Sequence, residues 1–390
     1  MEWPGASIRP VPATDLQRAR LATAAAFAAQ GALFAVLLTH LPQFKTRWGV
    51  GDGAITLTVL AVSLLAGAGS VAAESVAARA SSAAALRAGL LVIAGAAVAI
   101  ALAPGRVVFF LAFGLYGLGL GAVDAGSNMQ AVAVQHRYGR SILTSFHAVW
   151  SGAGIVGALW VAASNGLGLR ASVLAGAGAV MLLAAVASGG LVRGAPVVST
   201  AVAVPWRPVL LLGAAMVCFY VADAATSNWS AIYLHDTLHA LSGTAALGYA
   251  AYQATGLLAR VAGDQVVRRV GIVPTVRAAA VIGAVGMAVV VLAPDAWTAI
   301  VGFAVVGCGL PVVAPLCFSA AGLLAPEDAD AVVARVNVFN YAGSILGGVA
   351  VGLVGTVGQL RFGFLVPLVL ALALLGLARA FAPAPVAVAA

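Results

Sequence analysis

Long apolar stretches alternate with short polar or Pro- and Gly-containing breaks along almost the whole chain. A helix needs about 20 apolar residues to cross the hydrocarbon core of a bilayer. The stretches are close to that length, so the pattern predicts an all-α polytopic membrane protein with twelve transmembrane helices. We expect these helices at about residues 20–41, 54–74, 84–103, 107–134, 145–164, 168–192, 208–234, 244–266, 273–293, 297–324, 332–356 and 361–381.

The connection at 193–207 is rich in Pro and lacks a long apolar run. It divides the chain into an N-terminal six-helix bundle over 20–192 and a C-terminal six-helix bundle over 208–381. The flanking segments 1–19 and 382–390 are expected to be tails, because the first has neither the apolar core nor the cleavage site of a signal peptide. Two bundles of six helices are typical of transporters built from parallel repeats.

Basic residues are distributed unevenly across the predicted membrane. With twelve crossings, fifteen of the twenty Lys and Arg residues lie on the side of the two termini. The positive-inside rule then places both termini and the 193–207 linker in the cytoplasm. The net charge of +8 is explained by this topology and indicates no nucleic-acid partner.

Composition supports the membrane class. Hydrophobic residues make up 63% of the chain and charged residues only 8%, whereas a soluble domain has about 25% charged residues. The three cysteines fall in apolar stretches and are interpreted as small packing residues. No nucleophile–base pair, phosphate-binding motif or metal-ligand spacing occurs. We therefore expect a protein that is not an enzyme and has no cofactor and no metal site. We also expect it to be a monomer.

Asp124 is the only charged residue in the apolar stretch 107–134. Ionisable side chains at bilayer depth are costly, and they usually mark an ion path, a proton relay or a substrate contact. Asn128 follows one helical turn later, so the two polar groups share a face. The pair fits a structural contact between helices. It also fits a proton-coupling site in a central cavity, with Asn128 bonding the acid or a substrate hydroxyl, and we favour this second interpretation.

Asp223 is a second lone acid, about midway along the stretch 208–234. This depth resembles the place where transporters bind substrate between their two halves; a structural partner for a basic or hydroxyl group elsewhere is the alternative. Asn228 and Trp229 follow it toward the outer end. Trp229 fits an aromatic anchor at the membrane interface as well as a stacking surface for a ring. We assign all three residues to substrate binding.

Further polar side chains extend the expected substrate path. His147 and Trp150 lie near the start of the fifth predicted helix, where His147 fits either an interface contact or a step in a proton path. Gln30, Tyr252 and Gln253 are weaker candidates for the same path.

Asn337, Asn340 and Tyr341 are also candidates for substrate binding. Their spacing places them on one face of the eleventh predicted helix, which fits a cavity lining or hydrogen bonds between helices. In the tenth helix, Pro311 and Pro315 remove backbone hydrogen bonds and predict a bend.

Asp264 is followed by paired basic residues in the connection between the eighth and ninth predicted helices. With Arg260, Arg268 and Arg269, it predicts a cytoplasmic gate, a charge latch that joins helix ends and stabilises an outward-facing state. The matching connection of the first half, 74–87, lacks the Gly–Asp core and is interpreted as a degenerate form.

Six blocks along the chain form a recognisable set: Gly117–Asn128, Tyr138–Arg140, Phe146–His147, Asp223 with Asn228–Ser230, Gly263–Asp264 and Leu316–Gly322. The set resembles bacterial major facilitator superfamily proteins of the YbjJ-like group, which are relatives of the fucose and glucose permeases. The resemblance covers essentially the whole chain. It implies a twelve-helix fold with a central cavity between two bundles.

In the sugar permeases of that superfamily, an acid followed four residues later by Asn lies on the fourth helix and is linked to proton coupling. The resemblance implies this role for Asp124 and Asn128. The first-helix acid of the fucose permease has no counterpart, since residues 21–44 hold no carboxylate. The group's Glu of helix seven is replaced by Asp223, and its Asp before the Trp is replaced by Asn228. Sugar specificity therefore does not follow from the fold.

The leading hypothesis is a multi-pass transporter of the bacterial cytoplasmic membrane that couples proton symport to the movement of a small polar, sugar-like solute by alternating access. Its partners would be the lipid bilayer, protons and that small-molecule substrate. A proton antiporter that expels drugs or metabolites needs the same parts, and a largely apolar cavity exposing Trp150, Trp229 and Phe219 would favour it. A non-transporting membrane sensor is a remote alternative.

Overall fold

In the computed structural model, helices joined by short turns account for nearly all of the residues that the structure describes, which are 13–50, 52–192, 206–240, 242–357 and 360–382. The N-terminal half contains α1 (Ala13–Thr39), α2 (Leu41–Trp48), α3 (Asp52–Arg79), α4 (Ser82–Leu102), α5 (Arg106–Tyr138), α6 (Leu143–Ala163), η1 (Asn165–Leu167) and α7 (Leu169–Ser188). The C-terminal half contains α8 (Trp206–Ile232), η2 (Tyr233–Thr237), α9 (Ser242–Val270), α10 (Ile272–Leu292), α11 (Ala296–Gly309), η3 (Leu310–Val312), α12 (Val313–Leu324), η4 (Pro326–Asp328), α13 (Ala329–Val357), α14 (Leu360–Gly363), α15 (Leu365–Leu377) and η5 (Ala378–Phe381).

The helical segments agree with the all-α membrane class. Among the described residues, ten segments are long and apolar enough to cross a bilayer, and they coincide with ten of the predicted spans. The helices α6 and α9 occupy the positions of the fifth and eighth predicted spans but are not among the ten. Twelve crossings therefore stay a prediction.

Several helices extend beyond the predicted spans. The helix α1 begins at Ala13, inside the segment expected to be a tail, with Asp15 in its first turn, where a negative charge favours helix formation. The helix α9 continues to Val270, so the expected connection around Asp264 is helical until Gly271, whose φ of 89° is accessible to glycine. Residues 193–205 of the expected linker and 383–390 of the expected tail lie outside the described residues.

The connection expected at 74–87 is also largely helical. The helix α3 continues to Arg79, and α4 begins at Ser82. Ser81 starts α4, because its hydroxyl accepts the backbone N–H of Ala84 at 3.1 Å and thus caps the first turn. Glu74 and Arg79 are therefore presented by a helix.

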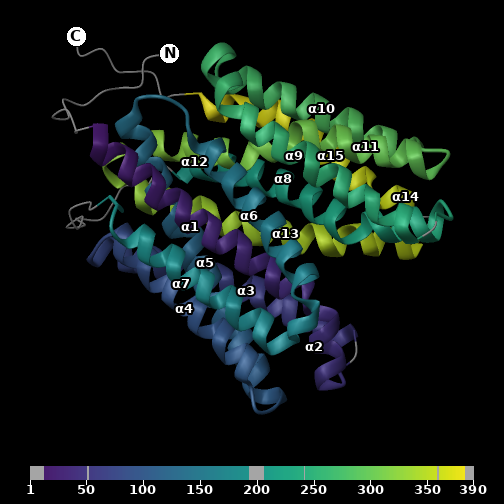
Figure 1. Cartoon of the computed structure of the whole chain (residues 1–390). Coiled ribbons are helices and arrows are strands. Elements are labelled where there is room, and N and C mark those ends of the chain that lie inside the picture. The colour runs from purple at the N-terminus through teal and green to yellow at the C-terminus, as the bar shows by residue number, and fades with distance from the viewer. Residues whose placement is uncertain (1–12, 51, 193–205, 241, 358–359, 383–390) are drawn as a thin grey trace, which may run out of the picture.

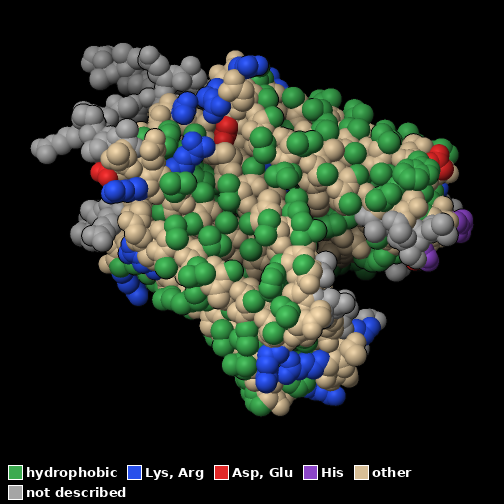
Figure 2. Space-filling model, in the orientation of Figure 1, with side chains coloured by type: hydrophobic (Ala, Val, Ile, Leu, Met, Phe, Trp, Pro, Cys, Tyr) green, Lys and Arg blue, Asp and Glu red, His purple; other side chains and the backbone are tan. Residues whose placement is uncertain are grey.

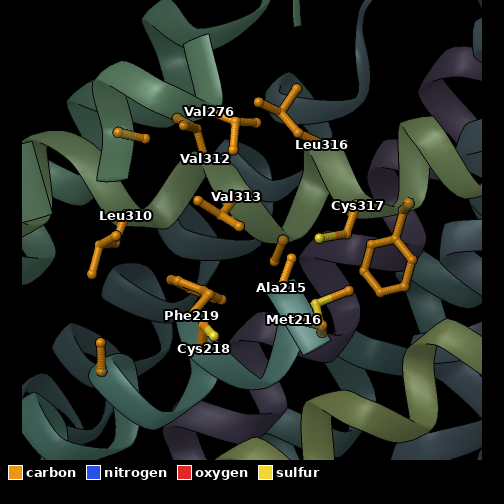
Figure 3. Close-up of a cluster of buried hydrophobic side chains, with 14 of the residues drawn as sticks. Ala215, Met216, Cys218, Phe219, Val276, Leu310, Val312, Val313, Leu316 and Cys317 are labelled. Carbon is orange, nitrogen blue, oxygen red and sulfur yellow. The ribbon is translucent and has the colours of Figure 1, made fainter. Parts of the chain in front are cut away.

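The tenth predicted span is interrupted at the place where a bend is predicted. A short 3₁₀ segment, η3, separates α11 from α12, and it contains Pro311. Proline removes a backbone donor and clashes with the preceding turn, so the regular helix is interrupted there. Figure 3 shows Val313 and Cys317, just after this break, packed with Ala215 and Met216 of α8 in the core of the C-terminal half.

The two halves lie side by side as two helical bundles. Figure 1 shows them close together at the end where α1 begins and separating toward α2 and α14. We call the end where α1 begins the terminal end; α5 finishes there, since the Arg20 guanidinium lies 5.7 Å from the centre of the Tyr138 ring. Figure 2 shows hydrophobic side chains over the sides of both bundles and Lys and Arg gathered toward their ends, as a bilayer requires.

Candidate functional site

Asp124 lies between the two bundles, about midway along α5. Its Oδ1 accepts a hydrogen bond from Gln30 Nε2 of α1 at 3.3 Å. Its Oδ2 accepts from Asn340 Nδ2 at 2.9 Å and from the Tyr341 hydroxyl at 3.0 Å, both on α13 of the opposite bundle. Three neutral donors therefore surround the carboxyl, and no ion pair reaches it in the described part of the chain.

Two amide oxygens beside this carboxyl have no hydrogen-bond partner. They are Gln30 Oε1 and Asn337 Oδ1, and both atoms are buried. The Asn337 side chain also interacts with the Asp124 carboxyl, while its Nδ2 donates to Ser70 Oγ at 3.1 Å. Buried acceptors without a donor are uncommon. The site therefore has fewer hydrogen-bond donors than acceptors, and a protonated acid or a solute hydroxyl would supply a donor.

Asn128 is fully buried and holds the backbone next to Asp124. Its Nδ2 donates to the Asp124 backbone carbonyl at 2.9 Å, so the expected bond to the acid's carboxyl is not formed. Its Oδ1 lies 3.1 Å from His147 Nε2 on α6. Because an amide oxygen only accepts, His147 donates from Nε2. Asn128 thus connects the backbone at Asp124 to the histidine.

The second acid, Asp223 on α8, is bound by a tyrosine of the next helix. The Tyr252 hydroxyl donates to Asp223 Oδ1 at 2.6 Å. Two turns further along α9, Arg260 is only 7% exposed. Its Nη1 donates to Ser151 Oγ of α6 at 2.8 Å, and its Nε donates to the Pro311 carbonyl at 3.3 Å. Arg260 therefore also links the two bundles.

Tyr220 relates these groups to one another. It lies on α8 one turn before Asp223 and is within electrostatic range of Asp124, Asp223 and Arg260. Tyr220 therefore interacts electrostatically with both acids and with Arg260. Sequence reasoning missed Tyr220, and the signal that would have found it is its i, i+3 spacing from Asp223 on one helix face.

Other predicted site residues lie elsewhere. Asn228 is exposed on α8, and Trp229 Nε1 donates to the Gly348 carbonyl of α13 at 2.9 Å, within the same bundle. Trp150 is half-buried against Phe34, with ring centres 5.9 Å apart. Gln253 is half-buried on α9. The structure brings none of these four into contact with either acid among the described residues.

The predicted latch residue Asp264 contacts the opposite bundle at the terminal end. Its Oδ1 accepts the Ser141 hydroxyl at 3.0 Å and the Thr144 N–H at 3.1 Å, and its Oδ2 accepts the Ser145 N–H at 2.9 Å. The Asp264 carboxylate thus binds the start of α6, where free N–H groups and the helix dipole attract a negative charge. Among the described residues, this carboxylate contacts a helix end, and no ion pair joins it to an arginine.

The arginines of the predicted gate differ in their contacts. Arg268 Nη1 donates to the Ser141 carbonyl at 2.8 Å, so it joins α9 to the residues before α6. Arg269 is exposed, and no hydrogen bond of its side chain is found among the described residues. Only three of the four gate residues, Asp264, Arg260 and Arg268, therefore bridge the bundles.

The first half has its own bridge at the terminal end. Glu74 Oε1 of α3 pairs with Arg335 Nε of α13 at 3.1 Å, which sequence reasoning did not anticipate. The Arg335 guanidinium also lies 5.1 Å from the centre of the Trp206 ring. The two bridges are arranged similarly, since each runs from a helix of one bundle to the start of a helix of the other.

Comparisons with known proteins agree with this architecture. No protein-family model matches the chain. It is 28% identical over 257 residues to an uncharacterized MFS-type transporter of Yersinia pestis, covering 64% of this chain and 66% of the relative, just under two thirds. It is 28% identical over 274 residues to an uncharacterized transporter of Sinorhizobium fredii, covering 69% of this chain and 73% of that protein.

Solved structures show the same fold. The transporter FucP in its outward conformation superposes with a TM-score of 0.76 at 14% identity, covering 93% of this chain and 98% of FucP. A bacterial homologue of the iron transporter ferroportin in its outward-facing state gives a TM-score of 0.70 at 14% identity, covering 94% and 98%. The resemblance to the major facilitator superfamily is confirmed, while the YbjJ-like subgroup stays a prediction.

Proposed function

We propose that this major facilitator protein is a proton-coupled secondary transporter that moves a small polar solute, with sugar-like solutes among the candidates, by alternating access. It would work as a monomer in the bacterial cytoplasmic membrane, with twelve crossings and both termini in the cytoplasm. The observation that carries the proposal is the Asp124 carboxyl, which is held between the bundles by neutral donors alone. A membrane-embedded acid without a cation can exchange a proton without breaking an ion pair.

Both protonation states of Asp124 have hydrogen-bond partners in this arrangement. The ionised carboxylate accepts from Gln30, Asn340 and Tyr341. The protonated acid needs an acceptor for its own hydrogen, and the oxygens of Gln30 and Asn337 are without donors. Proton uptake would therefore rearrange bonds that cross from α5 to α13.

This rearrangement supports coupling to bundle movement. Hydrogen bonds to an ionised group are about twice as strong as bonds between neutral groups. Protonation would weaken the bonds from Asn340 and Tyr341, which tie the two bundles at this depth. The bridges made by Asp264, Arg260, Arg268 and Glu74 would then be among the contacts that must open before the cytoplasmic side is reached.

A sugar-like solute is supported by one structural neighbour. The Escherichia coli protein named fucose:proton symporter FucP superposes with a TM-score of 0.74 at 14% identity, covering 93% of this chain. For this chain, Asp223, Asn340 and Tyr341 would contact the solute. Efflux of apolar compounds is less favoured, because Phe219 is buried and does not expose its ring.

The proposal is tested by uptake into proteoliposomes with an imposed pH gradient, acid outside. Labelled fucose, glucose and small polar metabolites are the probes. We expect at least one to accumulate, and a proton ionophore to abolish the accumulation. Asp124→Asn should stop gradient-driven accumulation yet keep exchange across the membrane without a gradient. Accumulation by Asp124→Asn equal to that of the unaltered protein would overturn the coupling role.

A further inference from the structure

The C-terminal bundle holds a buried guanidinium to which no carboxylate is bound in the described part of the chain. Both groups that Arg260 contacts, the Ser151 hydroxyl and the Pro311 carbonyl, are neutral. Its Nη2 makes no hydrogen bond among the described residues, and it is not one of the polar atoms sealed from solvent. A charge at this depth is costly unless a partner of opposite charge complements it.

Asp223 presents the opposite charge with an open side of its own. Its Oδ1 is occupied by the Tyr252 hydroxyl at 2.6 Å, whereas Oδ2 accepts no hydrogen bond from the described residues and is not sealed from solvent. Asp223 and Arg260 influence each other electrostatically, yet no ion pair joins them. Each therefore has one face available to a third group.

Both charges are associated with α9, because Tyr252, which bonds Asp223, and Arg260 lie about two turns apart on that helix. Tyr220 is within electrostatic range of both charges and of Asp124. Arg260 reaches across to Ser151 of the N-terminal bundle, so its guanidinium lies at the interface between the bundles. In a low-dielectric setting, separated opposite charges gain most from a ligand that pairs with both at once.

We propose that Asp223 and Arg260 recognise a small zwitterionic solute, with its ammonium group at Asp223 and its carboxylate at Arg260. The inference rests on the proposed transport function but changes its solute class, because it assigns a zwitterion to the inter-bundle site in place of a sugar-like solute. A planar guanidinium matches a carboxylate with two parallel hydrogen bonds. An uncharged sugar leaves both charges uncompensated, and a carboxylate without an amine pairs with Arg260 but is repelled by Asp223.

The test is thermal unfolding of the purified full-length protein with four sets of probes. They are small amino acids, the corresponding acids without the amino group, the corresponding amines without the carboxyl group, and the neutral sugars fucose and glucose. We expect at least one amino acid to raise the melting temperature by mass action, and the other three sets to have no effect. Stabilisation by a sugar or by a simple acid, or by no amino acid, would overturn the inference.

Substitutions of the two charged residues test whether they bind the amino acid. Asp223→Asn and Arg260→Gln should each weaken amino-acid binding by about 30-fold or more, since each leaves one solute charge buried and unpaired. Arg260→Lys keeps the charge and should retain part of the affinity. Arg277→Gln, which changes an exposed arginine of α10, is the matched control and should bind normally. If a variant does not fold, the comparison of the four probe sets on the unaltered protein tests the inference by itself.

Uptake experiments separate this inference from the proposed function. Labelled amino acid that binds but does not accumulate under a pH gradient would contradict proton-coupled transport and leave the recognition of zwitterions standing. Accumulation of a neutral sugar without binding of any amino acid would overturn the recognition of zwitterions and leave proton-coupled transport standing.

Discussion

Asp264 on α9 accepts the backbone N–H of Thr144 on α6 at 3.1 Å, although the two residues are 120 positions apart in the chain. The Ser145 N–H reaches the same carboxylate at 2.9 Å. Ile142, at the cap position of α6, has no side-chain acceptor. Gln135 of α5 accepts the N–H groups of Ile142 and Leu143, so the start of α6 is capped from its own bundle and, through Asp264, from the opposite bundle as well.

Asp264→Asn should loosen this junction. A carboxamide has a single acceptor oxygen and no charge to place against the helix dipole, and the loss of a cap costs about 1 kcal/mol. Amide hydrogen exchange of the purified protein measures the effect, and we expect the peptide covering 141–150 to exchange several-fold faster. Asp236→Asn, at an exposed position of η2, is the control. Unchanged exchange in Asp264→Asn would show that the cap is not structural.

The bridge between Glu74 and Arg335 should contribute less. Its side chains keep 21% and 27% of their exposure, and such pairs are screened by solvent. We expect Glu74→Gln to lower the free energy of unfolding by no more than about 1 kcal/mol. Unfolding in detergent at low and high salt provides the measurement. A loss that exceeds that of Asp264→Asn would contradict this order.

The difference between these two bridges shows how far sequence reasoning reached. Hydropathy located the helices because each must match the thickness of the bilayer. It also identified Asp264 as a contact across the bundles. The partner of Asp264 could not be predicted, because a single sequence reveals charges but not which backbone N–H groups lie opposite. Glu74 was set aside for the same reason.

The central site follows the same pattern. Asp124 was identified because a lone acid in an apolar stretch is costly. Its donors Asn340 and Tyr341 were chosen as candidates from their shared helix face, yet their pairing with an acid 216 and 217 positions away is a tertiary fact. Spacing on one helix defines a face, whereas the partner of that face depends on how the bundles pack.

Gly121 is required for the close approach of α5 to α3. A Cβ at this position would overlap the Ala66 carbonyl oxygen, which is part of a backbone and cannot move aside cheaply. We expect Gly121→Ala to destabilise the protein by about 1–3 kcal/mol, the cost of overpacking. Gly95→Ala is the matched control, because nothing lies within 4 Å of its added Cβ. Equal melting temperatures for the two variants would refute the packing argument.

His40, between α1 and α2, should make the fold sensitive to acid. Burial lowers the pKa of His40, and the hydrogen bond with Gln43 opposes this only in part. The folded protein therefore prefers the neutral ring. The contribution of His40 to the free energy of unfolding is fully present above the unfolded-state pKa of about 6.5. It is lost as the pH falls from there toward the lower folded-state pKa.

His40→Gln should flatten this dependence. The Gln side chain cannot take up a proton. The melting temperature of the variant should therefore change less between about pH 7 and about pH 5 than that of the unaltered protein. The His40 ring bonds Ser172 Oγ at 2.9 Å, and the variant is therefore expected to be less stable at neutral pH. A pH profile that keeps its slope in His40→Gln would assign the acid sensitivity to another group.

The bond between Tyr341 and Asp124 can be measured by a double-mutant cycle. Tyr341→Phe removes one donor to the carboxyl, and Asp124→Asn removes the charge that the donor serves. Hydrogen bonds to a charged group contribute about 1.5–3 kcal/mol, so the two changes should be non-additive by about 1 kcal/mol or more in the free energy of unfolding.

Tyr116→Phe is the control, because the buried Tyr116 hydroxyl has no hydrogen-bond partner. Tyr116→Phe should be neutral or stabilising and additive with Asp124→Asn. Additivity in the Tyr341 cycle would mean that the Tyr341–Asp124 bond does not tie the bundles together.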